Sequence, residues 1–383
     1  MSTKVLIVCD SFKESLVASD VAKAIARGIG AADAAARCTL MPFSDGGEGA
    51  IEVLEQNLNT GSSPGGHRVT CSTQDALGRP ISAQYFRFKH RSAAWVELSA
   101  ASGIHLIEPE ARDPKITSTY GTGLLIKHAI EQGATEIILG IGGSATNDAG
   151  AGIIQALGGK LLDEQGTELT RGGAALQGLA ALVPPEGLHS IKWQIACDVN
   201  NPLVGVHGAS HTYGPQKGAS QNDIACLESA LTHFAQKIKD THGVSIETIA
   251  GGGAAGGTAA GLHGVFKAEL ISGFELLCKM TSLEEIIKAC DVIITAEGRI
   301  DHQSLTGKVP ISVAQLGKKH RKPVIGVAGS IEPPYQAYGK AGLSSLFSIQ
   351  DGPMTLEDSK RNTARLIEDT LYRVWSLFKS IRQ

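Results

Sequence analysis

The chain has 383 residues, of which 42% are hydrophobic, and a formal net charge of −3 at pH 7. This length is enough for two domains with substantial cores, and the lack of a basic excess argues against a nucleic-acid partner. Glycine accounts for 46 residues, about 12% against a usual ~7%, and many of these glycines follow apolar runs.

No apolar run approaches the ~20 residues of a transmembrane helix. The run 5–8 near the N-terminus is too short for the core of a secretory signal. The seven cysteines are scattered and form no Cys-x-x-Cys pair, which predicts free thiols in a reducing compartment. We therefore expect a cytoplasmic protein that does not enter a membrane. The sequence leaves the oligomeric state open, and a homo-oligomer is compatible with it.

Both chain ends alternate apolar strands with amphipathic helices, the pattern of a parallel sheet. Near the N-terminus, Ser19 is the predicted cap of a helix whose Val21, Ile25 and Ile29 recur at helical spacing. The strands expected in these two regions are Lys4–Cys9, Cys38–Phe43, Val292–Thr295, Val324–Val327 and Leu346–Ile349. A helix at Val309–Leu316 and a final helix that buries Ile367, Leu371, Val374 and Phe378 complete the pattern.

Between the two ends, short alternating strands at Arg68–Ser72, Ile81–Phe88 and Ala93–Leu98 predict an antiparallel sheet. Further strands are expected at 137–139 and Gln194–Cys197, with a helix around Ile224–Ile238. We predict an α/β protein of two domains. Residues 1–64 and 281–383 form a discontinuous, Rossmann- or flavodoxin-like domain with a parallel sheet, and residues 65–280 form an inserted α/β domain with an antiparallel or mixed sheet.

A glycine-rich loop follows the strand at 137–139. A strand, a glycine loop and a helix N-terminus together let backbone N–H groups approach an anion closely, and Asp148 is placed to cap the helix. The loop lacks a Walker A ending and only loosely fits a dinucleotide fingerprint, so a tight turn without a ligand is the alternative. The candidate phosphate-binding residues are Gly142, Gly143, Ser144, Thr146 and Asn147.

Ligands of open α/β sheets bind beyond the carboxyl ends of the strands. Ser11 and Lys13 follow the first strand and Asp45 follows the second, while Arg299 and Asp301 follow a strand near the C-terminal end. The cations suit a carboxylate or a phosphate, and the carboxylates suit Mg²⁺ or the proton of a substrate hydroxyl. Each of these residues is also common in caps and turns, which is the competing interpretation.

Two polar segments of the central region are further candidates. Asp198 ends an apolar strand and is followed by asparagines, so its oxygens could hold a hard cation or build a turn. Lys217 lies among glycines, where a lysine meets a phosphate or simply faces solvent. No His-x-x-x-His pair supports a zinc site, and no Gly-x-Ser-x-Gly supports a serine hydrolase.

Seven collinear segments together resemble the bacterial glycerate 2-kinases of the type-1 glycerate kinase family. The resemblance extends from the first strand to about Ser330. Its motifs are Asp10-Ser-Phe-Lys-Glu-Ser-Leu16, Ser44-Asp-Gly-Gly-Glu-Gly49, Gly142-Gly-Ser-Ala-Thr-Asn-Asp148, Ala196-Cys-Asp-Val-Asn-Asn-Pro-Leu203, Gly214-Pro-Gln-Lys-Gly218, Gly253-Ala-Ala-Gly-Gly257, and Glu297-Gly-Arg-Ile-Asp301 through Gly307-Lys-Val-Pro310.

The resemblance implies ATP-dependent, Mg²⁺-assisted phosphorylation of D-glycerate at its 2-hydroxyl, in a cleft between two α/β domains. The individual roles are chemical hypotheses. Asp45 is the expected catalytic base, assisted by Lys13 and Arg299. Substrate contacts are expected from Ser11, Lys13, Arg299 and Lys217, phosphate contacts from the 142–147 loop, and Mg²⁺ contacts from Asp198 and Asp301.

Two other functions remain open at this stage. A kinase or an NAD-dependent dehydrogenase acting on another small hydroxy or sugar acid would share the α/β domain, but the first strand-to-helix turn of a dehydrogenase should carry Gly-x-Gly-x-x-Gly. A non-catalytic two-domain solute-binding protein is the alternative from a different class, and such proteins usually carry export signals.

Overall fold

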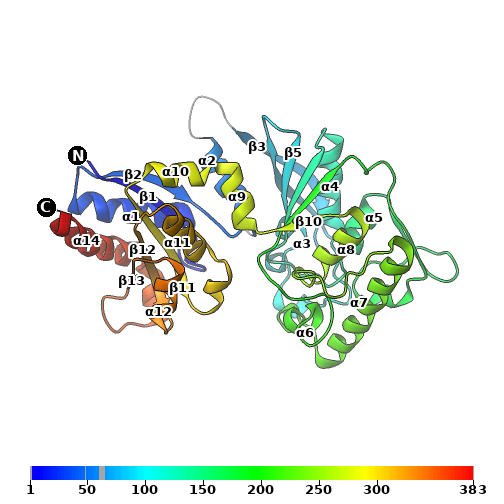
Figure 1. Cartoon of the computed structure of the whole chain (residues 1–383). Helices are drawn as coiled ribbons and strands as arrows, with labels where there is room; N and C mark the ends of the chain where they lie inside the picture. The colour runs from blue at the N-terminus through cyan, green and yellow to red at the C-terminus, as the bar shows by residue number, and fades with distance from the viewer. Residues whose placement is uncertain (1, 48, 60–64, 383) are drawn as a thin grey trace. The chain divides into compact units, whose positions relative to one another are not determined.

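The computed structural model describes residues 2–47, 49–59 and 65–382, which form two compact units (Figure 1). The first unit comprises Met1–Asp45, Glu52–Thr60 and Phe274–Gln383, and the second comprises Gly46–Ile51 and Gly61–Gly273. Each unit has its own sheet, one fully parallel and one mixed. The predicted fold class, a parallel domain made from both chain ends with an inserted mixed α/β domain, is confirmed.

The sheet of the first unit has five parallel strands in the order β2-β1-β11-β12-β13. This is the flavodoxin-like order, in which the chain leaves the first strand to one side and later returns on the other. The switch point therefore lies between β1 and β11. The strands are β1 (Lys4–Cys9), β2 (Arg37–Pro42), β11 (Val292–Ile300), β12 (Val324–Ile331) and β13 (Ser345–Ser348).

Helices cover both faces of this sheet because its strands are apolar on both sides, as parallel strands usually are. Alternate residues of β1, Val5 and Ile7, share a core with α1 (Ala18–Ala32) and α14 (Thr363–Arg382) on one face. Helix α11 (Val309–Lys319) packs against the other face, where a Cβ on Gly317 would lie 3.3 Å from Ile293. This double cover leaves the carboxyl ends of the strands as the place for polar side chains.

The second unit contains a six-stranded mixed sheet in the order β10-β9-β6-β5-β4-β3. The first four of these strands are parallel, and the last two add in antiparallel fashion, as the alternating sequence predicts. The strands are β3 (Gly66–Gln74), β4 (Pro80–Phe88), β5 (Ala93–Glu97), β6 (Glu136–Gly140), β9 (Lys192–Ala196) and β10 (Glu269–Ile271), with a separate hairpin of β7 (Lys160–Leu162) and β8 (Ala181–Val183).

The predicted Ser19 cap is wrong, because α1 begins at Ala18 after Val17 and makes no side-chain cap. Among the helices of the described residues, none is both long and apolar enough to cross a bilayer. The remaining α-helices are α2 (Ala50–Leu58), α3 (Ser99–Ser102), α4 (Tyr120–Glu131), α5 (Ala151–Ala156), α6 (Ala209–Tyr213), α7 (Gln221–His242), α8 (Thr258–Phe266), α9 (Gly273–Thr281), α10 (Leu283–Ala289), α12 (Tyr335–Ala341) and α13 (Leu356–Arg361).

Candidate active site

Three carboxylates meet at the switch point of the first unit. Asp10 follows β1, Asp45 follows β2, and Glu297 lies in the last part of β11. Burial, together with the negative charges of Asp45 and Glu297, raises the pKa of Asp10 to about 7 against the lowering effect of hydrogen bonds from Ser11. The charge of Asp45 acts on both Asp10 and Glu297. Asp10 can therefore accept a proton near neutral pH.

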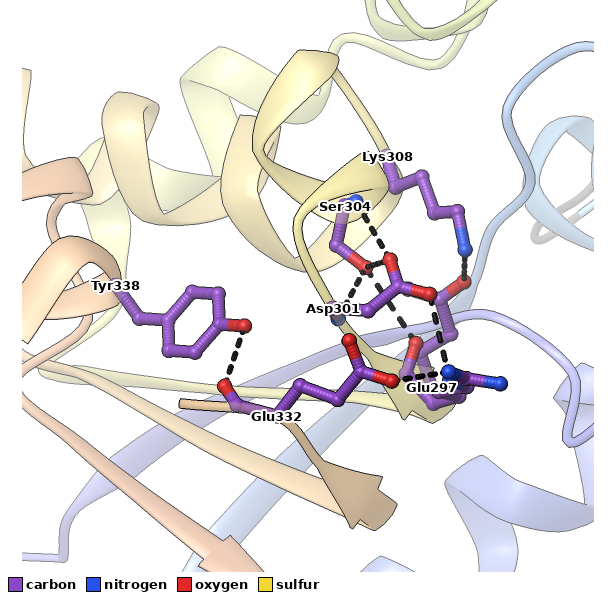
Figure 2. Close-up of polar contacts among 7 residues, drawn as sticks. Glu297, Asp301, Ser304, Lys308, Glu332 and Tyr338 are labelled. Atoms are coloured by element: carbon purple, nitrogen blue, oxygen red, sulfur yellow. Dashed lines mark hydrogen bonds and ion pairs between the residues drawn. The ribbon is translucent and has the colours of Figure 1, made fainter. Parts of the chain in front are cut away.

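A buried ion pair adds positive charge to this cluster. The Lys308 Nζ lies 2.9 Å from Glu297 Oε1, as Figure 2 shows, and Glu297 is only 7% exposed. Burial raises the pKa of Glu297 despite the lowering effect of Lys308. Burial acts to lower the pKa of Lys308, but the neighbouring Glu297 carboxylate outweighs it and the pKa is raised. Lys308 therefore stays cationic and can face phosphate oxygens.

The raised pKa of Asp10 predicts a pH-dependent stability. Between about pH 4 and 7 the folded chain keeps a proton that the unfolded chain releases, so the stabilisation is complete below about pH 4 and is lost as pH rises through about 7. We expect Asp10→Asn to remove this pH-dependent loss of stability. The difference between the Tm of the variant and the Tm of wild type should therefore increase from pH 5 to pH 8. Thermal unfolding at both pH values measures the effect. Asp20→Asn, at a partly exposed position of α1, is the control, and an equal Tm difference at both pH values would contradict the prediction.

Arg299 and Asp301 contact each other and their neighbours beyond β11. The Arg299 guanidinium pairs with Glu332 and lies 3.4 Å, Nε to Oδ2, from Asp301. Asp301 Oδ1 accepts hydrogen bonds from the backbone N–H and the hydroxyl of Ser304 at 3.0 and 3.2 Å (Figure 2). To bind a substrate carboxylate with both arms of its guanidinium group, Arg299 would have to break its ion pair with Glu332. Arg299 is therefore expected to bind a substrate anion more weakly than Lys13 does.

Lys13 and Ser11 extend from the loop after β1. Lys13 is exposed, and its charge acts on Glu297 to lower that group's pKa, so the ammonium lies near the carboxylate cluster. The Ser11 backbone N–H and hydroxyl both donate to Asp10 Oδ1, at 2.6 and 3.2 Å. Ser11 therefore positions Asp10, while Lys13 is the cation of this loop that a substrate anion can reach.

The turn after Asp45 requires glycine for a steric reason. Gly46 has a φ of +88°, and a Cβ there would lie 2.4 Å from the Cα of Gly273. The backbone of Gly273 fills the space beside Gly46, so this glycine serves chain packing and leaves no room there for a substrate. Asp45, the residue before this turn, is half-buried.

The glycine loop of the second unit is mostly interior. Gly143 is exposed with a φ of +68° and Gly142 is half-buried, whereas Thr146 and Asn147 are fully buried. Asp148 accepts hydrogen bonds from the backbone N–H groups of Gly150 and Gly152 at the start of the six-residue α5, but the N-cap position itself is Gly150 and carries no side-chain cap. The surface that an anion can approach is therefore at Gly142 and Gly143, because Ser144 is buried as well.

Lys217 supports this loop from inside. Its side chain is 2% exposed, and its Nζ donates to the Thr146 carbonyl at 2.6 Å. Burial lowers the pKa of Lys217 to about 7, against the raising effect of the Asp148 charge. A buried lysine on a loop carbonyl holds the loop in place. Its predicted contact with substrate would require the ammonium to leave this bond, so the geometry favours a positioning role.

The second glycine stretch, 251–257, packs against the first. Gly256 has a φ of +65°, and a Cβ there would lie 2.0 Å from the Thr146 carbonyl oxygen. In the following helix α8, a Cβ on Gly261 would lie 1.8 Å from the Ala149 oxygen. These glycines permit two backbones to touch, which accounts for them without a phosphate.

The two predicted metal ligands belong to different units, and each is oriented by a local contact. Asp198, half-buried after β9, accepts the Gly273 backbone N–H at 3.1 Å. Partial burial acts to raise the pKa of Asp301, but Ser304 and the charges of Lys308 and Arg299 lower it overall, so the group is anionic at neutral pH.

Within the described residues, no group of three or more His, Cys, Asp or Glu side chains could hold a metal ion. Mg²⁺ commonly needs only one or two protein carboxylates when substrate phosphates supply the other ligands. The anionic Asp301 therefore fits a metal ion that binds together with a nucleotide. It does not require a site in which protein side chains alone surround the metal.

Three members of the cluster, Asp10, Glu297 and Lys308, are missing from the predicted site residues. The strand-end rule points to Asp10, which follows β1, and to Glu297, which lies near the end of β11, but such residues are also common in caps and turns. Lys308 lies eleven positions beyond Glu297 and becomes a candidate only once α11 brings it back to β11. Its signal in the sequence is the Gly307-Lys-Val-Pro310 segment.

The chain was compared with known proteins and structures. Residues 5–379 match the model of the glycerate kinase family. Glycerate 2-kinase of Escherichia coli K12 is 44% identical over 94% of this chain and 93% of its own length, and glycerate kinase of Halalkalibacterium halodurans is 42% identical over 95% of both. The crystal structure of a protein assigned as glycerate kinase 2 from Salmonella typhimurium LT2 superposes with a TM-score of 0.86 over the full length of both chains, at 40% identity. With a family match that extends from β1 into α14, the chain belongs to the glycerate kinase family.

Proposed function

We propose that the chain transfers the γ-phosphoryl group of ATP to the 2-hydroxyl of D-glycerate, releasing ADP and 2-phosphoglycerate. The observation that carries this proposal is the cluster of three carboxylates and two lysines at the switch point of a flavodoxin-ordered sheet, in a chain of this family. The dehydrogenase alternative is not favoured, because the turn after β1 contains no glycine. A reducing, cytoplasmic location is part of the proposal and agrees with seven free cysteines.

The chemistry needs a base and an anchor for the acceptor. Asp45 takes the proton of the 2-hydroxyl as the oxygen attacks phosphorus, and Lys13 binds the glycerate carboxylate. Lys308, held by Glu297, offsets charge on the transferring phosphoryl group. Asp301 would hold Mg²⁺ together with phosphate oxygens, and the bound metal would supply further charge neutralisation.

The test of this function is direct. Purified chain is incubated with ATP, Mg²⁺ and D-glycerate, ADP release is followed by a coupled assay, and ³¹P NMR identifies the product. We expect ADP release that depends on both Mg²⁺ and glycerate, with 2-phosphoglycerate as the product. Glycerate-independent ADP release, or 3-phosphoglycerate as the product, would overturn the proposal.

The glycine loop is proposed to contact the phosphates of ATP through the backbone near Gly143. We expect Gly143→Val to raise the KM for ATP about tenfold, because a branched side chain blocks backbone approach. Gly166→Val is the matched control, since Gly166 is exposed in the same unit with a φ of +75° and would carry similar backbone strain. An unchanged KM in Gly143→Val, with a Tm equal to the control's, would remove the loop from the site.

A further inference from the structure

A cavity of about 740 Å³ opens at the carboxyl ends of β1, β11, β12 and β13 in the first unit. Volumes of ~300–1,000 Å³ are typical of sites for ligands of drug size. Glycerate, a three-carbon acid, would occupy a small fraction of this space. The cavity therefore has room for a much larger ligand than the acceptor of the proposed reaction.

The lining of the cavity changes character across the sheet. The charged residues near the ends of β1 and β11 are Glu297 and the cations Lys13, Arg299 and Lys308. After β13, the apolar side chains Ile349, Pro353, Met354 and Leu356 line the cavity together with polar groups and Lys360. Leu356 is 72% exposed, so this apolar side chain borders the cavity and is largely open to solvent. The two kinds of lining suit a ligand with an anionic part and a flat apolar part.

Polar groups also line the cavity in fixed orientations. The Gln350 amide donates to the Ser359 hydroxyl at 2.6 Å, and the Ser15 hydroxyl donates to the Thr363 hydroxyl at 2.6 Å. A few preset polar groups within an apolar wall give a pocket its specificity.

We propose that this cavity binds the nucleoside part of ATP, with the purine against the 349–356 segment and the phosphates toward Lys308. This inference rests on the proposed function and assigns its nucleotide site. The chemistry required is an aromatic ring for the apolar wall and a polyphosphate for the cations. It is independent of the glycine loop, whose proposed contact concerns the phosphates alone.

Gly352 gives a clean test of the purine position. It lines the cavity, its φ is ordinary, and a Cβ there would meet nothing within 4 Å, so the protein has room for the first atom of a Phe side chain at Gly352. Gly339→Phe is the matched control, because Gly339 also has open space and an ordinary φ but lies on α12 outside the cavity lining.

Isothermal titration calorimetry of the full chain with ADP, and separately with tripolyphosphate, tests the proposal. We expect Gly352→Phe to weaken ADP binding at least tenfold while tripolyphosphate binding changes less than twofold, and Gly339→Phe to match wild type for both. If Gly352→Phe lowers the Tm below that of Gly339→Phe, a second variant tests the same wall of the cavity. Leu356→Ser should weaken ADP binding severalfold, and Leu377→Ser, at an exposed position of α14, is its control.

The remaining outcomes count against the proposal. Equal ADP affinity in the cavity variants and wild type would overturn the nucleoside assignment, and equal weakening of ADP and tripolyphosphate would make the cavity a phosphate site alone. Because ADP binding is measured without glycerate, wild type that binds ADP but does not phosphorylate glycerate would refute the proposed function and leave the cavity assignment standing. Wild type that binds no ADP would refute both.

Discussion

We expect Asp45→Asn to lower kcat by about 10²–10⁴-fold with little change in either KM. The substitution keeps the size of the side chain and most of its turn contacts, but it removes the negative charge that accepts the proton of the 2-hydroxyl. General-base catalysis commonly contributes this much, and a role confined to the transition state lowers kcat without changing KM. Steady-state kinetics with ATP and glycerate varied separately give the three constants.

The controls for this variant use the same sheet. Asp291 precedes β11 at the opposite edge, where its Oδ2 accepts the Lys4 N–H at 2.8 Å, so Asp291→Asn should leave kcat unchanged. Asp10→Asn shows whether the neighbouring carboxylate, with its pKa of about 7, takes the proton instead. A near-normal kcat for Asp45→Asn together with a large loss for Asp10→Asn would reassign the base, and a near-normal kcat for both would leave Asp198 as the candidate.

The architecture was predictable because its signals are local. The strand patterns at both chain ends, the alternating strands of the central region and the glycine loop after β6 each appear within a few consecutive residues. The strand-end rule then placed Lys13, Asp45 and Asp301 at one edge of one sheet, since β1, β2 and β11 are parallel neighbours. The helix start at Ala18, ahead of the predicted Ser19 cap, was missed because backbone geometry at Val17, not a side-chain cap, begins α1.

The site residues were harder to predict because their roles depend on contacts distant in the sequence. Thr146 and Lys217 are 71 positions apart, and only the fold shows the lysine bound to the loop carbonyl. Arg299 is paired with Glu332 from beyond β12, which no local pattern indicates. Gly256 and Gly261 bring two backbones together, because a Cβ on either would meet the carbonyl oxygen of Thr146 or Ala149, residues more than a hundred positions earlier in the chain. Polar and glycine residues in the sequence thus indicate where a site lies, but they do not show which of them contact the ligand.

Lys13→Ala should raise the KM for glycerate about tenfold to 150-fold while the KM for ATP changes much less. A hydrogen bond between charged groups contributes roughly 1.5–3 kcal/mol, which gives this range. Lys13 is exposed and lines the cavity beside Glu297, so its ammonium is available to an incoming carboxylate, whereas the Arg299 guanidinium is already paired with Glu332. Initial rates with each substrate varied at saturating concentration of the other separate the two constants.

Two further variants make this result specific. Lys23→Ala removes an exposed lysine of α1 that pairs only locally with Asp20 at 2.8 Å, and it should leave both KM values unchanged. Arg299→Ala should raise the KM for glycerate less than Lys13→Ala does, because the arginine must first leave its carboxylate partners. If Lys13→Ala instead raises the KM for ATP and spares glycerate, Lys13 binds a phosphate. The carboxylate anchor would then have to be Arg299, released from Glu332 when substrate binds.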